Sequence, residues 1–335
     1  MDNRGVLVTG GTGIVGARLL FDLASRGERV YALKRPQSDI QTVSNVFRFL
    51  QDDGQLFERI EWLEGDITEY FSLEDAFQYA KSVIHAAALV SFNRKDRTRI
   101  FKVNVKGTEN VVNACLKSGV EVLGYVSSTA ALGVKKEGDI DEETKWNTDR
   151  GASYYSISKH YAEREVWRGH SEGLDIAVVN PCIVVGPGNW NRSSGTLFKK
   201  VKEGLNYYTE GSNAFVAVED VSAILLELLD RKVYGQRYLT IGENMSYKDF
   251  LQLVASEMKV NGAKKKAGKN LLKLAWLAES LRSTIMNDES RLTLDSLKSA
   301  VLKRSYSNQK ITEELGFSFT PIVEAVERTA KYYRD

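Results

Sequence analysis

Residues 153–161, SYYSISKHY, place three tyrosines, a lysine and a histidine close together. Tyr155 and Lys159 are four residues apart, so on a helix they share one face. A phenol has a pKa of about 10 and loses its proton more readily when a cation is near. The pair therefore suits a general acid or base, whereas Tyr154 and Tyr161 have no cation at that offset. The alternative is an amphipathic helix whose tyrosine packs into the core.

The spacing alone does not identify a site, because Tyr306 and Lys310 repeat it in YSNQK. That second copy lies in the C-terminal segment with no partner motif before it. The first copy follows a predicted strand that ends in YVSST, so Ser127 and Ser128 emerge at the carboxyl end of this strand. A serine hydroxyl at such an edge could hydrogen-bond the oxygen of a substrate carbonyl.

A glycine-rich loop lies near the start of the chain, in VTGGTGIVGARLL at residues 8–20. Gly10, Gly13 and Gly16 follow a predicted strand and open a predicted helix, which is the context that a dinucleotide-binding loop requires. Glycine lets the backbone turn tightly and approach a pyrophosphate, and the helix start supplies free N–H groups. We therefore expect this loop to bind a dinucleotide.

The end of the second predicted strand indicates which dinucleotide binds. NAD sites usually place an acidic residue about 20 residues after the glycines, on the ribose 2′-hydroxyl. Here YALKRPQSD has Lys34 and Arg35 at that place, and no acid comes before Asp39. A guanidinium can bind a 2′-phosphate. The sequence thus favours NADP(H) over NAD(H), unless these two cations are solvated charges at a strand end.

Two further segments follow predicted strands. GDI, residues 65–67, could place a carboxylate near the adenine amino group, and HAAA, residues 85–88, offers small side chains where a cofactor lies against the sheet. Both lie at the carboxyl ends of strands, where open α/β sheets bind ligands.

Short apolar runs alternate with helical patterns through the first half of the chain. The strand candidates are residues 5–9, 29–33, 59–63, 82–86, 122–127 and 175–180. Nearly continuous apolar runs are typical of strands that are buried on both faces. Strand–helix alternation at this spacing predicts an α/β fold with a doubly wound parallel sheet of the Rossmann type.

The alternation loosens after residue 186, and from about residue 243 the chain reads as mostly helical. We expect an NAD(P)-binding domain over residues 1–186, to which 214–242 return. Residues 187–335 are expected to form a smaller, mostly helical substrate-binding domain.

Composition narrows the class of protein. The 335 residues carry 46 Lys and Arg against 44 Asp and Glu, and this net charge of +2 gives no reason to expect a nucleic acid or a membrane as partner. Two cysteines imply no disulfide framework and fit a cytoplasmic protein. No signal peptide and no apolar run of about 20 residues is present. The three histidines are scattered, so we expect no metal site.

The segment KKKAGKNLLKLAWLAESL, residues 264–281, has an amphipathic pattern behind a group of lysines. The apolar residues that share one helix face are Leu271, Leu274, Ala275, Ala278 and Leu281. This helix either lies on a membrane surface or packs over its own domain. The second interpretation is favoured, because a single lysine-flanked helix without another anchor binds membranes weakly.

Taken together, the motifs resemble the extended short-chain dehydrogenase/reductase superfamily over nearly the whole chain. The matching segments are TGGTGIVG at 9–16, GDI at 65–67, HAAA at 85–88, NVKGT at 104–108, SST at 127–129, YSISK at 155–159 and NPCIVVGPG at 180–188. The resemblance implies the catalytic set Ser128, Tyr155 and Lys159. Ser128 is chosen over Ser127 because Gly133 aligns with the glycine of the family's S-x-x-x-Y-G segment.

Within the superfamily the chain is most similar to the dihydroflavonol-reductase-like and 3β-hydroxysteroid-dehydrogenase-like branch. Arg35 stands where that branch has its 2′-phosphate arginine, and NPCIVVGPG resembles its P-x-x-V-x-G-P segment, which meets the nicotinamide carboxamide. The implied activity is NADP(H)-dependent reduction of an aldehyde or ketone, or oxidation of the alcohol. The expected cofactor contacts are Gly10, Thr12, Gly13, Ile14, Val15, Gly16, Lys34, Arg35, Asp66, Ile67, Ala86, Ala87, Ala88, Tyr155, Lys159, Pro181 and Val184.

A nucleotide-sugar epimerase with tightly bound NAD is the alternative reading of this resemblance. Thr129 and Ala130 follow Ser128 where a dehydratase would carry acids. The arginine segment of sugar-nucleotide members is missing, although Arg192 and Arg304 could partly substitute for it. A non-catalytic, cofactor-sensing regulator is less expected, because such proteins tend to lose the tyrosine or the lysine.

A small-molecule substrate should lie between the sheet edge and the C-terminal helices. The residues expected to line its pocket are Ser91, Phe92, Trp190, Asn191 and Arg192. Family members often dimerise through a helical bundle that includes the YxxxK helix, so we expect a homodimer.

Overall fold

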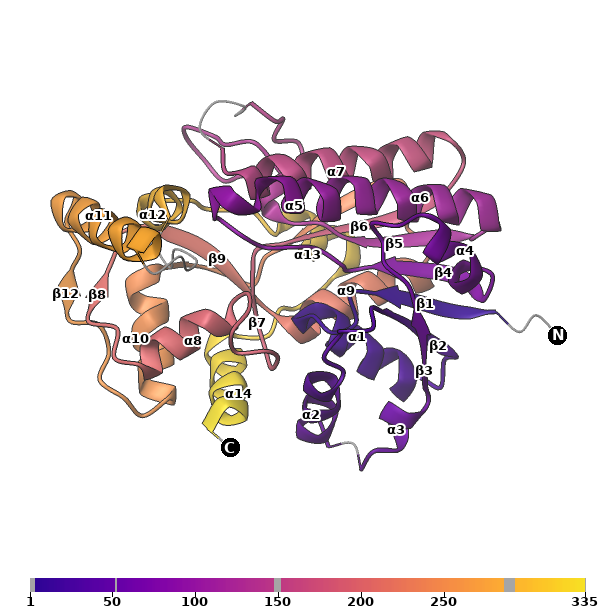
Figure 1. The fold of residues 1–335 in the computed structure, drawn as a ribbon, viewed down its shortest axis with the longest axis horizontal. Helices are drawn as coiled ribbons and strands as arrows, with labels where there is room; N and C mark the ends of the chain where they lie inside the picture. The colour runs from indigo at the N-terminus through magenta and orange to yellow at the C-terminus, as the bar shows by residue number, and fades with distance from the viewer. Residues whose placement is uncertain (1–3, 52, 148–151, 286–292, 335) are drawn as a thin grey trace.

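The computed structural model describes residues 4–51, 53–147, 152–285 and 293–334. Seven strands form one parallel sheet in the order β10-β6-β5-β4-β1-β2-β3 (Figure 1). They are β1 (Gly5–Thr9), β2 (Val30–Lys34), β3 (Ile60–Glu64), β4 (Ala80–His85), β5 (Val122–Val126), β6 (Asp175–Pro181) and β10 (Gln236–Thr240). The predicted doubly wound parallel sheet is therefore confirmed.

Helices cover both faces of this sheet. Successive residues of a strand point to opposite faces, so neighbouring residues belong to different hydrophobic cores. Leu7 of β1 belongs to the core under α4 (Phe71–Phe77), α6 (Gly107–Ser118) and α7 (Tyr154–Ser171). Its neighbour Val8 belongs to the opposite core. The helices over that core are α1 (Ile14–Ser25), α2 (Gln41–Phe49) and α9 (Val218–Asp230). In Figure 1 the first group lies above the sheet and the second below it.

The chain reverses its winding direction between β1 and β4, which are neighbours in the sheet. After β1 the strands are added on one side, and after β3 the chain returns to add β4 on the other. Such a switch point opens a crevice at the carboxyl ends of the strands. Thr9 and His85 end the two strands at this crevice.

A smaller unit built from the second half of the chain lies beside the carboxyl ends of the large sheet (Figure 1). It has a three-stranded sheet, β11-β9-β7, and a two-stranded ribbon, β12-β8. The strands are β7 (Ile183–Val185), β8 (Tyr207–Tyr208), β9 (Ser212–Ala217), β11 (Glu243–Ser246) and β12 (Lys265–Lys266). The helices are α8 (Gly195–Lys202), α10 (Tyr247–Glu257), α11 (Lys269–Ile285), α12 (Leu294–Val301) and α14 (Ile322–Arg334). Outside this unit, shorter helices are α3 (Gln55–Glu58) and α5 (Arg97–Phe101), which lie between strands of the large sheet. Another short helix, α13 (Gln309–Leu315), precedes α14.

The expectation that the apolar stripe of residues 264–281 packs on the protein is wrong for most of that stripe. Leu271 and Leu274 are 38% and 64% exposed, and Ala275 and Ala278 are exposed as well. Leu281 lies outside the side chains that the structure describes. α11 instead turns Leu272, Trp276 and Glu279 toward the protein, since these positions, with Arg282, are half-buried among its described side chains. No helix among the described residues is long and apolar enough to cross a bilayer.

Candidate active site

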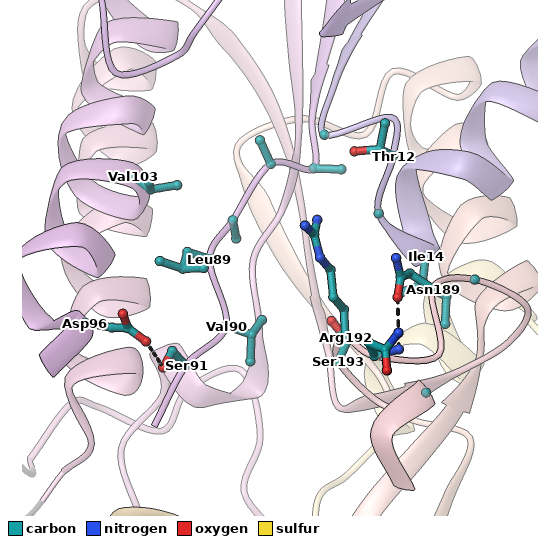
Figure 2. A pocket seen from close by; sticks show the side chains of 18 of the residues that line it. Thr12, Ile14, Leu89, Val90, Ser91, Asp96, Val103, Asn189, Arg192 and Ser193 are labelled. Atoms are coloured by element: carbon teal, nitrogen blue, oxygen red, sulfur yellow. Dashed lines mark hydrogen bonds between the residues drawn. The ribbon is translucent and has the colours of Figure 1, made fainter. Parts of the chain in front are cut away.

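A cavity of about 630 Å³ lies at the carboxyl ends of β1, β2 and β4 (Figure 2). Its walls contain most of the residues expected to contact a cofactor or substrate. These are Gly10, Thr12, Gly13, Ile14, Arg35, Asp66, Ile67, Ala86, Ala87, Ala88, Ser91, Phe92, Asn191 and Arg192. The described lining does not include Val15, Gly16, Lys34, Pro181, Val184 or Trp190, nor the three residues of the catalytic set.

The three glycines of the loop meet three different steric demands. Gly10 has φ +75°, and a Cβ there would come within 2.5 Å of the Ala87 nitrogen. A Cβ on Gly16 would lie 2.1 Å from the Gly10 oxygen. A Cβ on Gly13 would meet only that same oxygen, at 3.3 Å, so the space in front of Gly13 is open. Tight turn, open approach and close helix packing are the demands of a pyrophosphate-binding loop.

α1 begins directly at this open approach. Gly13 is its N-cap and contributes no side-chain hydrogen bond, and no acidic residue occupies the first turn. The free N–H groups and the positive end of the helix dipole thus face the cavity uncompensated. This chemistry fits a pyrophosphate, which is the part of a dinucleotide that the loop would hold.

The turn after β2 places a cation in the cavity wall. Arg35 and Ser38 both line the cavity, and the Arg35 backbone nitrogen donates to the Ser38 hydroxyl at 3.0 Å. Asp39, the first acid after the strand, accepts hydrogen bonds from Thr42 that lower the pKa of its carboxyl. Asp39 is not among the described lining residues. The turn after β2 therefore contributes a cation and no acid to the described lining of the cavity.

The residues expected to meet the substrate are divided between two walls of the cavity, with Ser91 on one side and Arg192 on the other (Figure 2). Figure 2 shows the Arg192 side chain rising between the two walls, with its guanidinium toward the loop that carries Thr12. Ser91 donates its hydroxyl proton to Asp96 at 2.6 Å. Trp190 instead packs its ring against Tyr333, with 5.1 Å between centroids. Arg192 thus faces the space in which a dinucleotide would lie.

Ser128 and Tyr155 meet at the edge of the sheet. Ser128 follows β5, and the start of α7 carries Tyr155, whose helix is capped by the Ser153 hydroxyl. Burial raises the pKa of the Tyr155 phenol, and the hydrogen bond with Ser128 opposes this rise. The Tyr155 ring also meets Phe92 of the cavity wall edge-on, at 5.9 Å. The serine–tyrosine pair therefore borders the cavity through Phe92.

Lys159 is almost completely buried below the pair, with 2% of its surface exposed. Its ammonium donates to the Tyr125 hydroxyl at 2.9 Å and to the Val126 carbonyl at 3.1 Å. Burial lowers the pKa of Lys159 to about 7, while the Glu163 carboxylate opposes that shift. Lys159 thus reaches the carboxyl end of β5, as a residue that holds a cofactor ribose would.

Glu163 is a buried residue of this site that sequence reasoning missed. Its carboxylate accepts hydrogen bonds from Ser127 at 2.6 Å, Asn180 at 2.7 Å, Arg237 at 2.9 Å and Trp167 at 3.3 Å. The Asn180 amide also donates to the Ser128 carbonyl at 3.1 Å. Glu163 thus connects the end of β5 with β6, β10 and α7 beneath the serine–tyrosine pair. In the sequence, the feature that could have pointed to Glu163 is its position four residues, or one helical turn, after Lys159.

Asn104 and His85 are two further buried polar residues without an assigned role at the sequence level. Asn104 pairs with both backbone groups of Leu89, at 2.7 and 3.0 Å, and with the Ser158 hydroxyl at 2.9 Å. It thereby fixes the loop after β4 against α7. The His85 ring lies between the hydroxyls of Thr9 and Thr108, and burial lowers its pKa to about 3. NVKGT and HAAA were the segments that could have pointed to them.

A second cavity, of about 480 Å³, lies on the other side of the serine–tyrosine pair. It is lined by Thr129 and Ala130, which follow Ser128, and by Ser153 and Ser156, which flank Tyr155. Cationic residues of the wall are Lys135, Lys136, Lys298, Lys303 and Arg304, against the acids Glu137 and Asp295. Ser128 and Tyr155 therefore lie between a cavity suited to a dinucleotide and a second space for another molecule.

Comparison with known proteins identifies the family of the chain. Residues 6–242 match the model of the NAD dependent epimerase/dehydratase family. The chain is 32% identical to sterol demethylase protein B of Methylococcus capsulatus over 73% of this chain and 72% of that protein. It is 28% identical to a putative dihydroflavonol 4-reductase of Synechocystis over 98% and 94% of the two chains. The crystal structure of gox2253 superposes with a TM-score of 0.81 at 28% identity, covering 99% of this chain and 98% of that one.

Proposed function

Because the chain belongs to the NAD dependent epimerase/dehydratase family, we propose that it is an NADP(H)-dependent oxidoreductase. It reduces an aldehyde or ketone to the alcohol, or oxidises the alcohol in the reverse direction. The observation that carries the proposal is the position of Tyr155, whose ring contacts Phe92 in the wall of the cavity that the glycine-rich loop lines.

A reduced nicotinamide dinucleotide supplies the hydride for such a reaction when it is bound. Tyr155 acts as the general acid that gives its proton to the carbonyl oxygen. Its raised pKa keeps the phenol protonated at neutral pH, as a proton donor must be. The Ser128 hydroxyl orients and polarises the same oxygen. In the oxidation direction Tyr155 is the base.

Lys159 holds the cofactor and keeps positive charge beneath the reacting oxygen. An ammonium has three donors, and Tyr125 and Val126 take two of them. The third is available for a ribose hydroxyl. Because the Lys159 pKa lies at about 7, its charge is lost as the pH rises through neutrality, and activity should fall with it.

Arg35 carries the preference for NADP(H). It lines the cavity at the end of β2, where an NAD-specific site would have an acid, and it has no ion pair within the described part of the chain. Arg192 lies across the cavity and adds positive charge to the same space. Both cations favour the dinucleotide with the additional phosphate.

A nucleotide-sugar epimerase is the second candidate, and the charge of the second cavity favours it. Lys136, Lys298, Lys303 and Arg304 line that space without an ion pair among the described residues. Such a wall could receive the diphosphate of a nucleotide sugar. In that case the cofactor would be NAD that stays bound through the reaction.

A panel of carbonyl compounds and UDP-sugars, followed at the nicotinamide absorbance and by product analysis, separates the two candidates. The oxidoreductase consumes NADPH with a carbonyl compound, whereas the epimerase converts a UDP-sugar with no net change in the cofactor. Tyr155→Phe keeps the ring against Phe92 and should lower turnover by about 10²–10⁴-fold while NADPH binding remains. A fully active Tyr155→Phe enzyme would exclude both candidates.

A further inference from the structure

The surface around α11 combines exposed apolar side chains with a concentration of positive charge. Leu271, Leu274 and Leu277 are 38%, 64% and 54% exposed. They lie on the side of the helix away from the half-buried residues Leu272 and Trp276. A solvent-exposed leucine row costs free energy in water, and contiguous patches of this kind mark interaction surfaces.

The lysines next to this row stand out from the charge of the whole chain. Residues 259–273, KVNGAKKKAGKNLLK, contain six lysines and no acidic residue, although the complete chain has a net charge of only +2. Lys266 pairs with Glu210 at 2.6 Å. Lys264, Lys265 and Lys273 are exposed and have no ion pair within the described residues. Their charge is therefore available to an external anion.

An aromatic residue belongs to the same surface. β12 pairs with β8, so that Lys265 lies opposite Tyr207, which is 42% exposed. α11 follows β12 after only two residues, and Figure 1 shows α11, β12 and β8 together at one end of the molecule, away from the seven-stranded sheet. Tyrosine is favoured at the boundary between water and lipid, because its ring is apolar and its hydroxyl is polar.

We propose that α11 and the β8–β12 ribbon form a docking surface for a lipid bilayer with anionic headgroups. The leucines enter the boundary of the acyl region, while the lysines bind the headgroups. The ribbon provides the second anchoring element that a single amphipathic helix lacks. α12, which follows α11, lines both cavities through Ser296 and Lys298. The docked face is thus on the substrate side of the protein.

A second copy of the chain is a poorer occupant of this surface. A two-fold interface brings the same patch of both subunits together. Here it would place the lysines of one subunit against those of the other, and like charges in contact oppose association. An anionic lipid surface can bind the lysines through its headgroups and bury the leucine row in its acyl region.

Flotation with vesicles tests the proposal on the full chain. We expect binding to vesicles of phosphatidylcholine mixed with phosphatidylglycerol, and far weaker binding to phosphatidylcholine alone. Lys264→Gln with Lys265→Gln should weaken binding about 25-fold, since each lysine near an anionic surface contributes about five-fold. Leu274→Gln with Leu277→Gln should weaken it at least about ten-fold. Added salt should weaken the binding of the unchanged protein.

A matched control changes the same residue types on another helix. Val323 of α14 is 50% exposed and Lys331 of α14 is exposed, so Val323→Gln with Lys331→Gln should leave vesicle binding unchanged. Thermal unfolding verifies that each variant is folded. The proposal is overturned if the unchanged protein does not float with anionic vesicles, or if either α11-region variant floats as well as the control. It is equally overturned if the leucine variant dissociates a homodimer, measured by light scattering, while no vesicle binding is seen.

Discussion

Replacing Glu163 with glutamine tests how the buried network supports the catalytic pair. The Glu163 carboxylate is 3% exposed and lies one turn of α7 after Lys159. One of its oxygens accepts from Ser127 and Asn180, and the other from Arg237 and Trp167. Glutamine keeps the shape of the side chain but removes the charge, and its amide nitrogen cannot accept the two hydrogen bonds that one carboxylate oxygen receives. The substitution therefore changes the electrostatics of Lys159 more than the packing.

The size of the effect follows from the spacing on the helix. Side chains one turn apart lie about 6 Å from each other, and at an effective dielectric constant of about 20 their charges interact by about 3 kcal/mol. That energy corresponds to roughly two pKa units. Arg237 neutralises part of the Glu163 charge at 2.9 Å, so we expect the pKa of Lys159 to fall by about one unit.

The assay is the pH dependence of kcat/KM for NADPH-dependent reduction of whichever carbonyl compound the panel selects. Burial holds the pKa of Lys159 at about 7, and Glu163 supports the charged form. If the ammonium is required, kcat/KM is level at low pH and falls as the pH rises through this pKa. Glu163→Gln should move the descending limb about one unit to lower pH. At pH 8 the loss is then about ten-fold, and near pH 5.5 it is small.

Glu165→Gln is the matched control, because Glu165 lies on the same helix and pairs with Arg168 at the surface. Its profile should coincide with that of the unchanged enzyme. An equal loss of kcat/KM at every pH in Glu163→Gln would refute the electrostatic reasoning and leave Glu163 a structural role. A descending limb that moves to higher pH in Glu163→Gln would refute the expectation that the Glu163 charge raises the pKa of Lys159.

Three further outcomes are expected. Arg35→Glu should weaken NADPH binding about 10- to 100-fold while NADH binding is kept, because a charge-assisted bond to phosphate is lost; equal losses for both nucleotides in a fluorescence titration would argue against a 2′-phosphate contact. Gly13→Ala should weaken NADPH binding at least about ten-fold and change the free energy of unfolding by about 1 kcal/mol or less. Gly16→Ala should also destabilise the fold, since its Cβ would lie 2.1 Å from the Gly10 oxygen. His85 is buried and its pKa is lowered to about 3. Below about pH 6.5 the unfolded chain therefore binds a proton at His85 that the folded protein does not bind, and the free energy of unfolding decreases as the pH falls. Urea unfolding at pH 5 and pH 7 should show this loss as about 2 kcal/mol, and His85→Gln should remove it.

Local patterns were enough to predict the parallel sheet and the glycine-rich loop. A strand buried on both faces must be apolar along its length, as Val122–Val126 of β5 is, and such runs are visible without a structure. The steric demands on Gly10 and Gly16 arise within a few residues of each other and with the adjacent strand β4. The sequence therefore carried both features in short segments.

The partners of Glu163 could not be predicted in the same way. Asn180 and Arg237 belong to β6 and β10, and Ser127 directly follows β5. Only the sheet order β10-β6-β5 brings these three residues, distant in sequence, to one carboxylate. The same limit applies to α11. Helical periodicity shows that Leu271 and Leu274 share a face, but not whether that face meets the protein or the solvent.

Tyr306 and Lys310 show why context selects Tyr155 and Lys159 from two copies of the same spacing. Tyr306 is not on a helix with Lys310, because α13 begins only at Gln309. Tyr306 is buried, and its backbone pairs with Ile140. Lys310 lies over the Tyr238 ring at 4.3 Å and donates to the Arg237 carbonyl at 3.1 Å.

The two side chains of YSNQK thus attach the C-terminal segment to different parts of the protein, and no common face forms. In YSISK both residues belong to one continuous helix whose start lies at the carboxyl end of β5. A four-residue spacing has chemical meaning only where a helix converts it into proximity and a strand end provides the third group. In the proposed site Ser128 is that third group, next to a tyrosine that shares a helix with its lysine.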